Sequence, residues 1–87
     1  MKSSREWIGR PRAEEELHEL GQWVRALRLA RGLSQNDLAR PYSRAFVSLL
    51  EAGGISPSPR AIETLAARLG VHPQVLTARR GPSEMSR

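Results

Sequence analysis

The chain has 87 residues, a length that accommodates one domain around one small hydrophobic core. It holds no cysteine, which excludes disulfides and thiolate metal sites, and its two histidines lie far apart without metal-ligand spacing. Basic residues outnumber acidic ones by 14 to 9, and 13 of the 14 are arginine, whose planar guanidinium suits phosphate groups. The same excess of arginine can also reflect genomic base composition.

The charges are unevenly distributed along the chain. Five arginines lie between residues 25 and 44, where Asp37 is the one acid, whereas the acids gather chiefly between residues 14 and 19. A basic stretch on a small domain favours a polyanionic partner, although a run of charge by itself usually marks a solvated surface.

Glycine, proline and capping residues divide the chain into a series of short helices. Residues 1–13 show no sustained period and are predicted to form a flexible arm. Three glutamates and a leucine–valine stripe predict a first helix that begins near Glu14 and ends at Gly32. Ser34, with an acid three residues later, predicts a second helix over 34–40.

The second half of the chain continues in the same way. Ser43 can cap a third helix over 43–52, and Ser58 followed by proline predicts the start of a fourth helix that Gly70 closes. A short fifth helix opens near Pro73. We therefore expect an all-α fold of five helices over 14–80, with 81–87 as a disordered tail.

The second and third helices are joined by a turn so tight that they must cross steeply, which is typical of a helix-turn-helix. At about 100° per residue, one side of the third helix holds an apolar group that can pack inward: Phe46, Val47 and Leu50. The other side holds exposed, small and acid-free residues: Arg44, Ala45, Ser48, Leu49 and Ala52. Such a face permits close approach to DNA.

The chain resembles the lambda-repressor-like (Cro/repressor-type, or XRE) helix-turn-helix family. The resemblance is carried by Leu27-Arg28, the run from Arg31 to Ala39, the run from Phe46 to Gly53, Pro57, and the apolar pattern from Ala61 to Val71. It implies a five-helix all-α domain that binds a palindromic operator as a homodimer. It also implies a dimer surface on the fifth helix, around Val75 and Leu76.

The same resemblance assigns structural roles to three residues. Gln35 matches a glutamine that contacts a DNA phosphate and braces the first residues of the recognition helix. Arg28 and Glu51 match a pair that forms a structural ion pair between the first and third helices, as a buried charge requires. We therefore treat this pair as scaffold.

Four residues fall at base-contacting positions of the family: Arg44, Ala45, Ser48 and Leu49. Arg44 suits either a bidentate contact with guanine or a phosphate contact, and Ser48 can bond either base type. Ala45 or Leu49 can touch a thymine methyl group.

The turn between the second and third helices departs from the family pattern, because Pro41-Tyr42 replaces a longer, glycine-containing turn. Tyr42 can pack over this turn or reach a phosphate. Ser43 is first a helix cap and secondly a phosphate contact. Gly54 stands where the family often carries a basic residue that contacts the DNA backbone.

We expect a bacterial or phage transcriptional regulator, a repressor or an activator, that binds double-stranded DNA in the cytoplasm at the nucleoid. No catalytic constellation, phosphate loop or metal cluster is visible, so no enzymatic activity, cofactor, metal or small-molecule substrate is expected. No apolar run has the length of a membrane span or a signal peptide. A protein-interaction adaptor or antitoxin-like module with the same fold, and one domain of a longer regulator, are the open alternatives.

Overall fold

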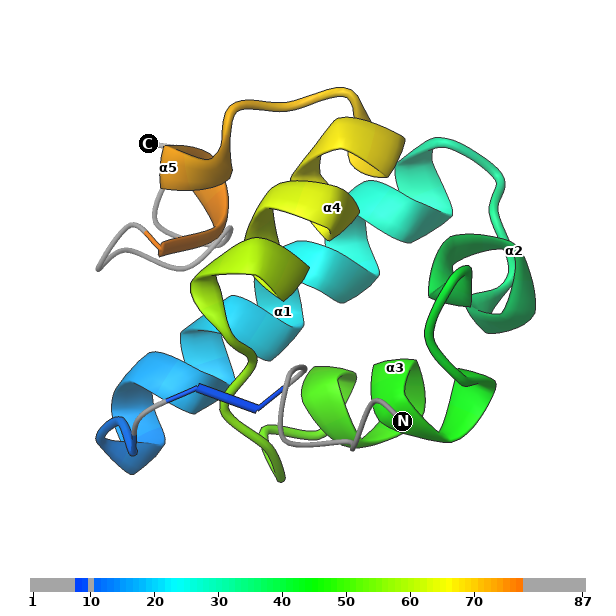
Figure 1. Cartoon of the computed structure of the whole chain (residues 1–87). Helices are drawn as coiled ribbons and strands as arrows, with labels where there is room; N and C mark the ends of the chain where they lie inside the picture. The colour runs from blue at the N-terminus through cyan, green and yellow to red at the C-terminus, as the bar shows by residue number, and fades with distance from the viewer. Residues whose placement is uncertain (1–7, 10, 78–87) are drawn as a thin grey trace.

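The computed structural model describes residues 8, 9 and 11–77, and these residues form five helices (Figure 1). The helices are α1 (Glu14–Ala30), α2 (Gln35–Ala39), α3 (Arg44–Glu51), α4 (Pro59–Leu69) and α5 (Pro73–Thr77). The predicted all-α architecture is confirmed, and the predicted tail at 81–87 lies outside the described residues. None of the helices between residues 11 and 77 combines the length and apolarity needed to cross a membrane.

Side-chain caps begin three of these helices at the predicted serines. The hydroxyl oxygens of Ser34, Ser43 and Ser58 each accept a hydrogen bond from the backbone N–H three residues later, at 2.9, 3.1 and 3.1 Å. Each bond satisfies a backbone donor that the helix itself leaves unpaired. Gly53 and Gly70 follow α3 and α4 with φ of +77° and +73°, a conformation that glycine adopts without a Cβ penalty. The local starts and stops were therefore predictable.

The core lies where α1 and α4 pack together, with α2 and α3 to one side and α5 beyond the opposite side (Figure 1). Its largest fully buried side chains are leucines, valines and one proline: Leu20, Leu38, Leu50, Leu65, Leu69, Leu76, Val24, Val47 and Pro57. Gly21 marks the point where α1 touches α3. A Cβ at this glycine would lie 2.6 Å from the carbonyl oxygens of Leu50 and Glu51, so only glycine allows the contact.

Part of the predicted flexible arm is attached to the connector between α3 and α4. The Gly9 N–H donates to the Ser56 carbonyl at 2.7 Å, and Ile8 pairs with Pro57 in an isolated antiparallel bridge. A Cβ at Gly9 would collide with the Pro57 carbonyl. This attachment corrects the prediction of a flexible arm at Ile8 and Gly9. The rest of the arm through residue 7, together with residue 10, lies outside the described residues.

The fifth helix also differs from its predicted role. Leu76 is only 1% exposed and belongs to the core, while Val75 is half-buried. Leu76 therefore cannot contribute to a dimer surface in the folded chain, which corrects half of the surface predicted there. His72 Nδ1 accepts a hydrogen bond from the Gln74 N–H at 3.1 Å, so this histidine caps α5.

Candidate nucleic-acid interface

The third helix has one packed face and one exposed face. Phe46, Val47 and Leu50 are at most 3% exposed and pack into the core. The opposite face is exposed and consists of Arg44, Ala45, Ser48, Leu49 and the C-cap residue Ala52. This division is the one that the helical period predicted.

A buried ion pair fixes the end of α3 to α1. Arg28 Nε donates to Glu51 Oε2 at 2.6 Å and Arg28 Nη2 donates to Glu51 Oε1 at 3.1 Å, with side chains 9% and 4% exposed. The hydrogen bond to Glu51 raises the pKa of Arg28 above its ordinary value, although burial of the guanidinium opposes this rise. Arg28 thus stays charged, and the predicted structural ion pair is confirmed.

The same two residues extend the connection to α2 and to the loop before it. Arg28 Nη1 donates to the Leu33 carbonyl at 2.9 Å, and Gln35 Nε2 donates to Glu51 Oε1 at 3.2 Å. Gln35 therefore braces the last residue of α3, whereas the resemblance implied a brace at the first residues. A carboxamide nitrogen carries two hydrogens, so one remains for another acceptor such as a phosphate.

Tyr42 packs over the turn between α2 and α3, which is one of its two predicted roles. Its ring lies 5.1 Å from the Phe46 ring between centroids, and its hydroxyl donates to Thr64 Oγ1 on α4 at 3.4 Å. The side chain is half-buried over the turn and directed toward α4. Its predicted contact with DNA stays a prediction. Ser43 caps α3 as predicted, and its hydroxyl hydrogen is not used by that cap.

Two residues that the sequence analysis did not single out help to position α2 and α3. Gly21 allows α1 to touch α3, and a glycine inside a helix was a signal for such a contact because it otherwise costs about 1 kcal/mol relative to alanine. Arg68 Nη2 on α4 donates to the Asp37 carbonyl at 2.6 Å and thereby satisfies a carbonyl near the end of α2. No local pattern indicated that second contact.

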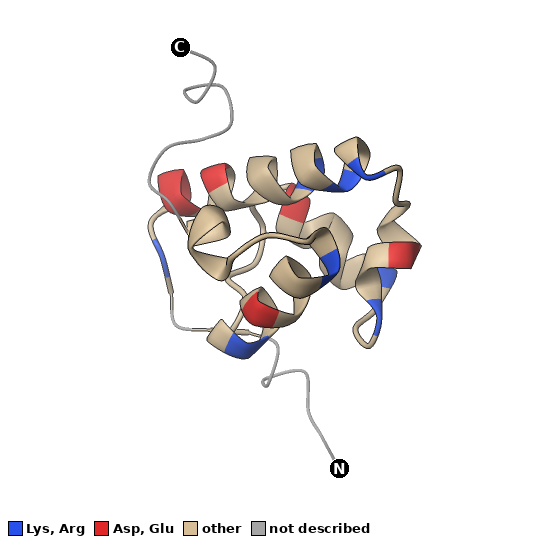
Figure 2. Cartoon of the chain, turned by 90° about the horizontal axis from the view of Figure 1, so that it is seen from above, with Lys and Arg blue, Asp and Glu red and all other residues tan. Residues whose placement is uncertain are grey.

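The charges on α1 are separated along the helix. Figure 2 shows acidic residues at its N-terminal end and basic residues at its C-terminal end, the arrangement that the helix dipole favours. Of the arginines between residues 25 and 44, Arg28 is neutralised by Glu51. Arg40 and Arg44 are exposed at the end of α2 and the start of α3. Positive charge thus remains beside the exposed face of α3.

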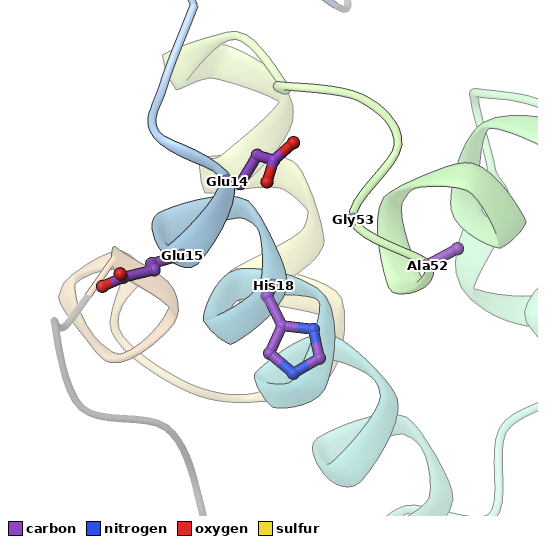
Figure 3. Close-up of a pocket in the computed structure, with 5 residues that line it drawn as sticks. All are labelled: Glu14, Glu15, His18, Ala52 and Gly53. Atoms are coloured by element: carbon purple, nitrogen blue, oxygen red, sulfur yellow. The ribbon is translucent and has the colours of Figure 1, made fainter.

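A shallow hollow of about 390 Å³ lies between the start of α1 and the end of α3 (Figure 3). It is lined by Glu14, Glu15, His18, Ala52 and Gly53. Glu14 and Glu15 point in different directions in Figure 3, so they do not form an acid–base pair. Within residues 8, 9 and 11–77, no group of histidines and acids is arranged to hold a metal ion. We assign no ligand to this hollow.

A capped α2, a tight turn and an α3 with a packed inner face and an exposed outer face together define a helix-turn-helix. A family model described as "Helix-turn-helix domain" matches residues 19–80. The chain therefore belongs to the helix-turn-helix domain family, as the sequence resemblance implied.

Solved structures show the same architecture. The restriction-modification controller protein C.AhdI from Aeromonas hydrophila is 39% identical, with a TM-score of 0.67, over 69% of this chain and 94% of that chain. The hypothetical transcription factor NHTF from Neisseria is 29% identical, with a TM-score of 0.70, over 92% of this chain and 93% of that chain.

A more distant likeness is to an HTH_3 family transcriptional regulator from Vibrio cholerae. It is 23% identical, with a TM-score of 0.68, over 76% of this chain and 39% of that chain, and this likeness shows the fold alone. A search of the curated proteins found no match.

Proposed function

We propose that the chain is a sequence-specific DNA-binding transcriptional regulator whose helix α3 enters the major groove. The observation that carries this proposal is the exposed face of α3, which begins with Arg44 and bears no unpaired acid. Glu51, the one acid of α3, is occupied by Arg28 and Gln35. A polyanion therefore meets no uncompensated negative charge on this helix.

The side chains on this face suit distinct parts of a duplex. Arg44 can bond the O6 and N7 atoms of guanine with two N–H groups, and Ser48 can bond either base type. The second hydrogen of the Gln35 amide and the Ser43 hydroxyl hydrogen are donors for phosphate oxygens, which fix the register of a protein on DNA. We therefore assign base contacts to Arg44 and Ser48, and phosphate contacts to Gln35 and Ser43.

Two of the similar structures support the same class of function. They are a restriction-modification controller protein and a hypothetical transcription factor. An operator on the chromosome would place the protein at the nucleoid.

We further propose that the chain binds its operator as a homodimer. The two-fold symmetry of a dimer matches a palindromic site whose half-sites lie about 34 Å apart or a multiple of it. Because Leu76 is buried, a surface on α5 would rely on Val75 and its exposed neighbours. Sedimentation equilibrium of the free protein and of its complex with DNA would give the number of copies in each.

Selection from a random duplex library followed by sequencing tests the proposal directly. We expect one enriched motif, with two inverted copies if the protein binds as a dimer. Affinity for the enriched duplex should fall steeply with salt, with a logarithmic slope of about −0.9 for each phosphate contacted. Recovery of no enriched motif would contradict the proposal and favour an adaptor that uses the same fold.

A further inference from the structure

The connector between α3 and α4, residues 52–58, is held by two residues that precede α1. Ile8 pairs with Pro57 in the antiparallel bridge, and the Gly9 N–H donates to the Ser56 carbonyl at 2.7 Å (Figure 1). Ser56 is only 8% exposed, and a buried carbonyl is costly without a donor. We call Ile8 and Gly9 the strap.

The close approach of the strap to the connector, and not its backbone angles, requires glycine at position 9. Gly9 does not have a positive φ, so its backbone would accept another residue. A Cβ there would lie 3.0 Å from the Pro57 carbonyl carbon and 3.1 Å from Ser58 Cα, and it would collide with the Pro57 carbonyl oxygen. All three are backbone atoms, which cannot swing aside as the end of a flexible side chain can. A side chain at position 9 therefore pushes the strap off the connector.

The connector carries this contact to the last turn of α3. The Gly53 N–H donates to the Leu50 carbonyl at 3.1 Å, and the Gly54 N–H donates to the Leu49 carbonyl at 2.8 Å. Both bonds hold the first residues of the connector against the carbonyl end of α3. A connector that is fixed at Ser56 is thus fixed to α3 within a few residues.

We propose that Gly9 is a positioning residue for DNA binding, because the strap fixes the carbonyl end of α3 relative to the core. This inference rests on the proposed DNA-binding function. Tyr42 packs on Phe46 near the start of α3, and Gly21 of α1 touches its end. The strap adds a further support at that end, and a binding surface tolerates displacements of only about 0.5 Å. Gly9 therefore acts on DNA binding through α3 and not by contact with DNA.

The test compares full-length variants by the ratio of two affinities, one for the enriched duplex and one for a scrambled duplex of the same composition. Gly9→Ala should lower this ratio about tenfold, the effect of losing about one base contact. Its affinity for the scrambled duplex should change little, because that affinity depends on phosphate contacts. Neither residue of the strap belongs to the hydrophobic core, so the variant should still fold. Circular dichroism selects a temperature at which every variant is fully folded.

Two control variants separate positioning from stability. Ile8→Ala lies in the strap but keeps the backbone bridge and adds no Cβ, so it should keep the wild-type ratio. Val71→Ala removes partly buried packing after α4 and should lower Tm without changing the ratio. A fall of the ratio in Val71→Ala as large as that in Gly9→Ala would reduce the effect to lost stability and overturn the inference.

Amide hydrogen exchange measured by NMR tests the hold on the connector without DNA. The Gly54 N–H should exchange faster in Gly9→Ala than in the wild type, because its bond to the Leu49 carbonyl opens with the connector. The amides in the middle of α4 should keep their rates. An unchanged rate at Gly54, or an unchanged affinity ratio, overturns the inference while specific binding, and hence the proposed function, stands. If the library yields no enriched duplex, the proposed function and this inference both fail.

Discussion

Two arginines from the same basic stretch end in opposite environments. Arg28 is 8% exposed, and its N–H groups donate hydrogen bonds to Glu51 and to the Leu33 carbonyl. Arg44 is exposed, and its guanidinium has no partner among the residues that the structure describes. A buried guanidinium must be paired because its desolvation is otherwise uncompensated. The contrast separates the charge that holds the helices together from the charge available to a ligand.

The adjacent leucines of α3 repeat this contrast without charge, and they give the largest expected effect. Leu50 is fully buried, whereas Leu49 is 50% exposed. Leu50→Ala should lower the free energy of unfolding by about 3–4 kcal/mol, because it leaves a cavity in the core. Leu49→Ala should change it by no more than about 0.5 kcal/mol. Urea unfolding of both variants measures the difference, and equal losses would show that α3 is not divided into two faces.

Removal of one partner of the ion pair tests the buried side of the comparison. Glu51→Ala should cost about 3 kcal/mol, because Arg28 would remain charged in a largely buried place. The corresponding fall in Tm is roughly 12–24 °C for a domain of this size. Thermal unfolding followed by circular dichroism provides the measurement.

A double variant separates the pair's geometry from its charge. Arg28→Leu combined with Glu51→Leu should lower the free energy of unfolding by less than the sum of the two single changes. The double variant removes both charges, so no buried charge is left unpaired. Strict additivity would mean that the two side chains do not depend on one another, in conflict with the 2.6 Å contact.

The features that the sequence predicted are local ones. Caps at Ser34, Ser43 and Ser58 depend on residues within one turn, and the two faces of α3 follow from its period alone. The Arg28–Glu51 pair spans 23 residues and was reached through resemblance to a family, not through any local pattern.

The features that escaped prediction depend on distant parts of the chain. Tyr42 reaches α4 through Thr64, and Gly9 binds Ser56 across 47 positions of sequence. Neither contact has a periodic signature, since each joins single residues. Leu76 looked like a surface residue of a short helix, yet the packing of α5 on α1 and α4 buries it. In α5, tertiary packing therefore decides that Leu76 faces inward.

The exposed arginine is expected to matter for binding and not for stability. Arg44→Ala should weaken specific DNA binding by about 1–3 kcal/mol, the range for one bidentate base contact. Arg25→Ala, an exposed arginine on α1, serves as the matched control and should lose less. Fluorescence anisotropy with the enriched duplex compares them. If both variants lose affinity equally on all sequences, Arg44 contacts phosphate and does not read a base.

A charge added beside the exposed face should sharpen the same comparison. Gly54→Lys meets only ordinary contacts, because a Cβ there would lie 3.5 Å from the Leu49 carbonyl. The new ammonium group should make the slope of log affinity against log salt concentration more negative by about 0.9, the value for one more phosphate contact. Stability should change little. An unchanged slope would mean that this loop does not approach the DNA backbone.

The smallest expected effect concerns Asp37, the acid inside the basic stretch. The Ser34 N–H donates to its carboxylate at 3.0 Å and holds the pKa of Asp37 below its ordinary value, with further help from the Ser34 hydroxyl, Arg68 and Arg40. Because the folded-state pKa is the lower one, the unfolded chain binds more protons between the two values. This stabilisation is therefore complete above the ordinary pKa of 3.8 and is lost as the pH falls through the lower, folded-state value.

Comparison of the wild type with Asp37→Asn isolates this contribution, because the amide keeps the shape of the side chain and cannot ionise. The wild type should have the higher Tm at neutral pH, and the gap between the two proteins should narrow as the pH falls below about 4. Thermal unfolding across that range gives both curves. A gap that stays constant with pH would assign the effect of Asp37 to its shape in the capping box and not to its charge. In that case the charge of Asp37 would make no contribution of its own to stability within the basic stretch.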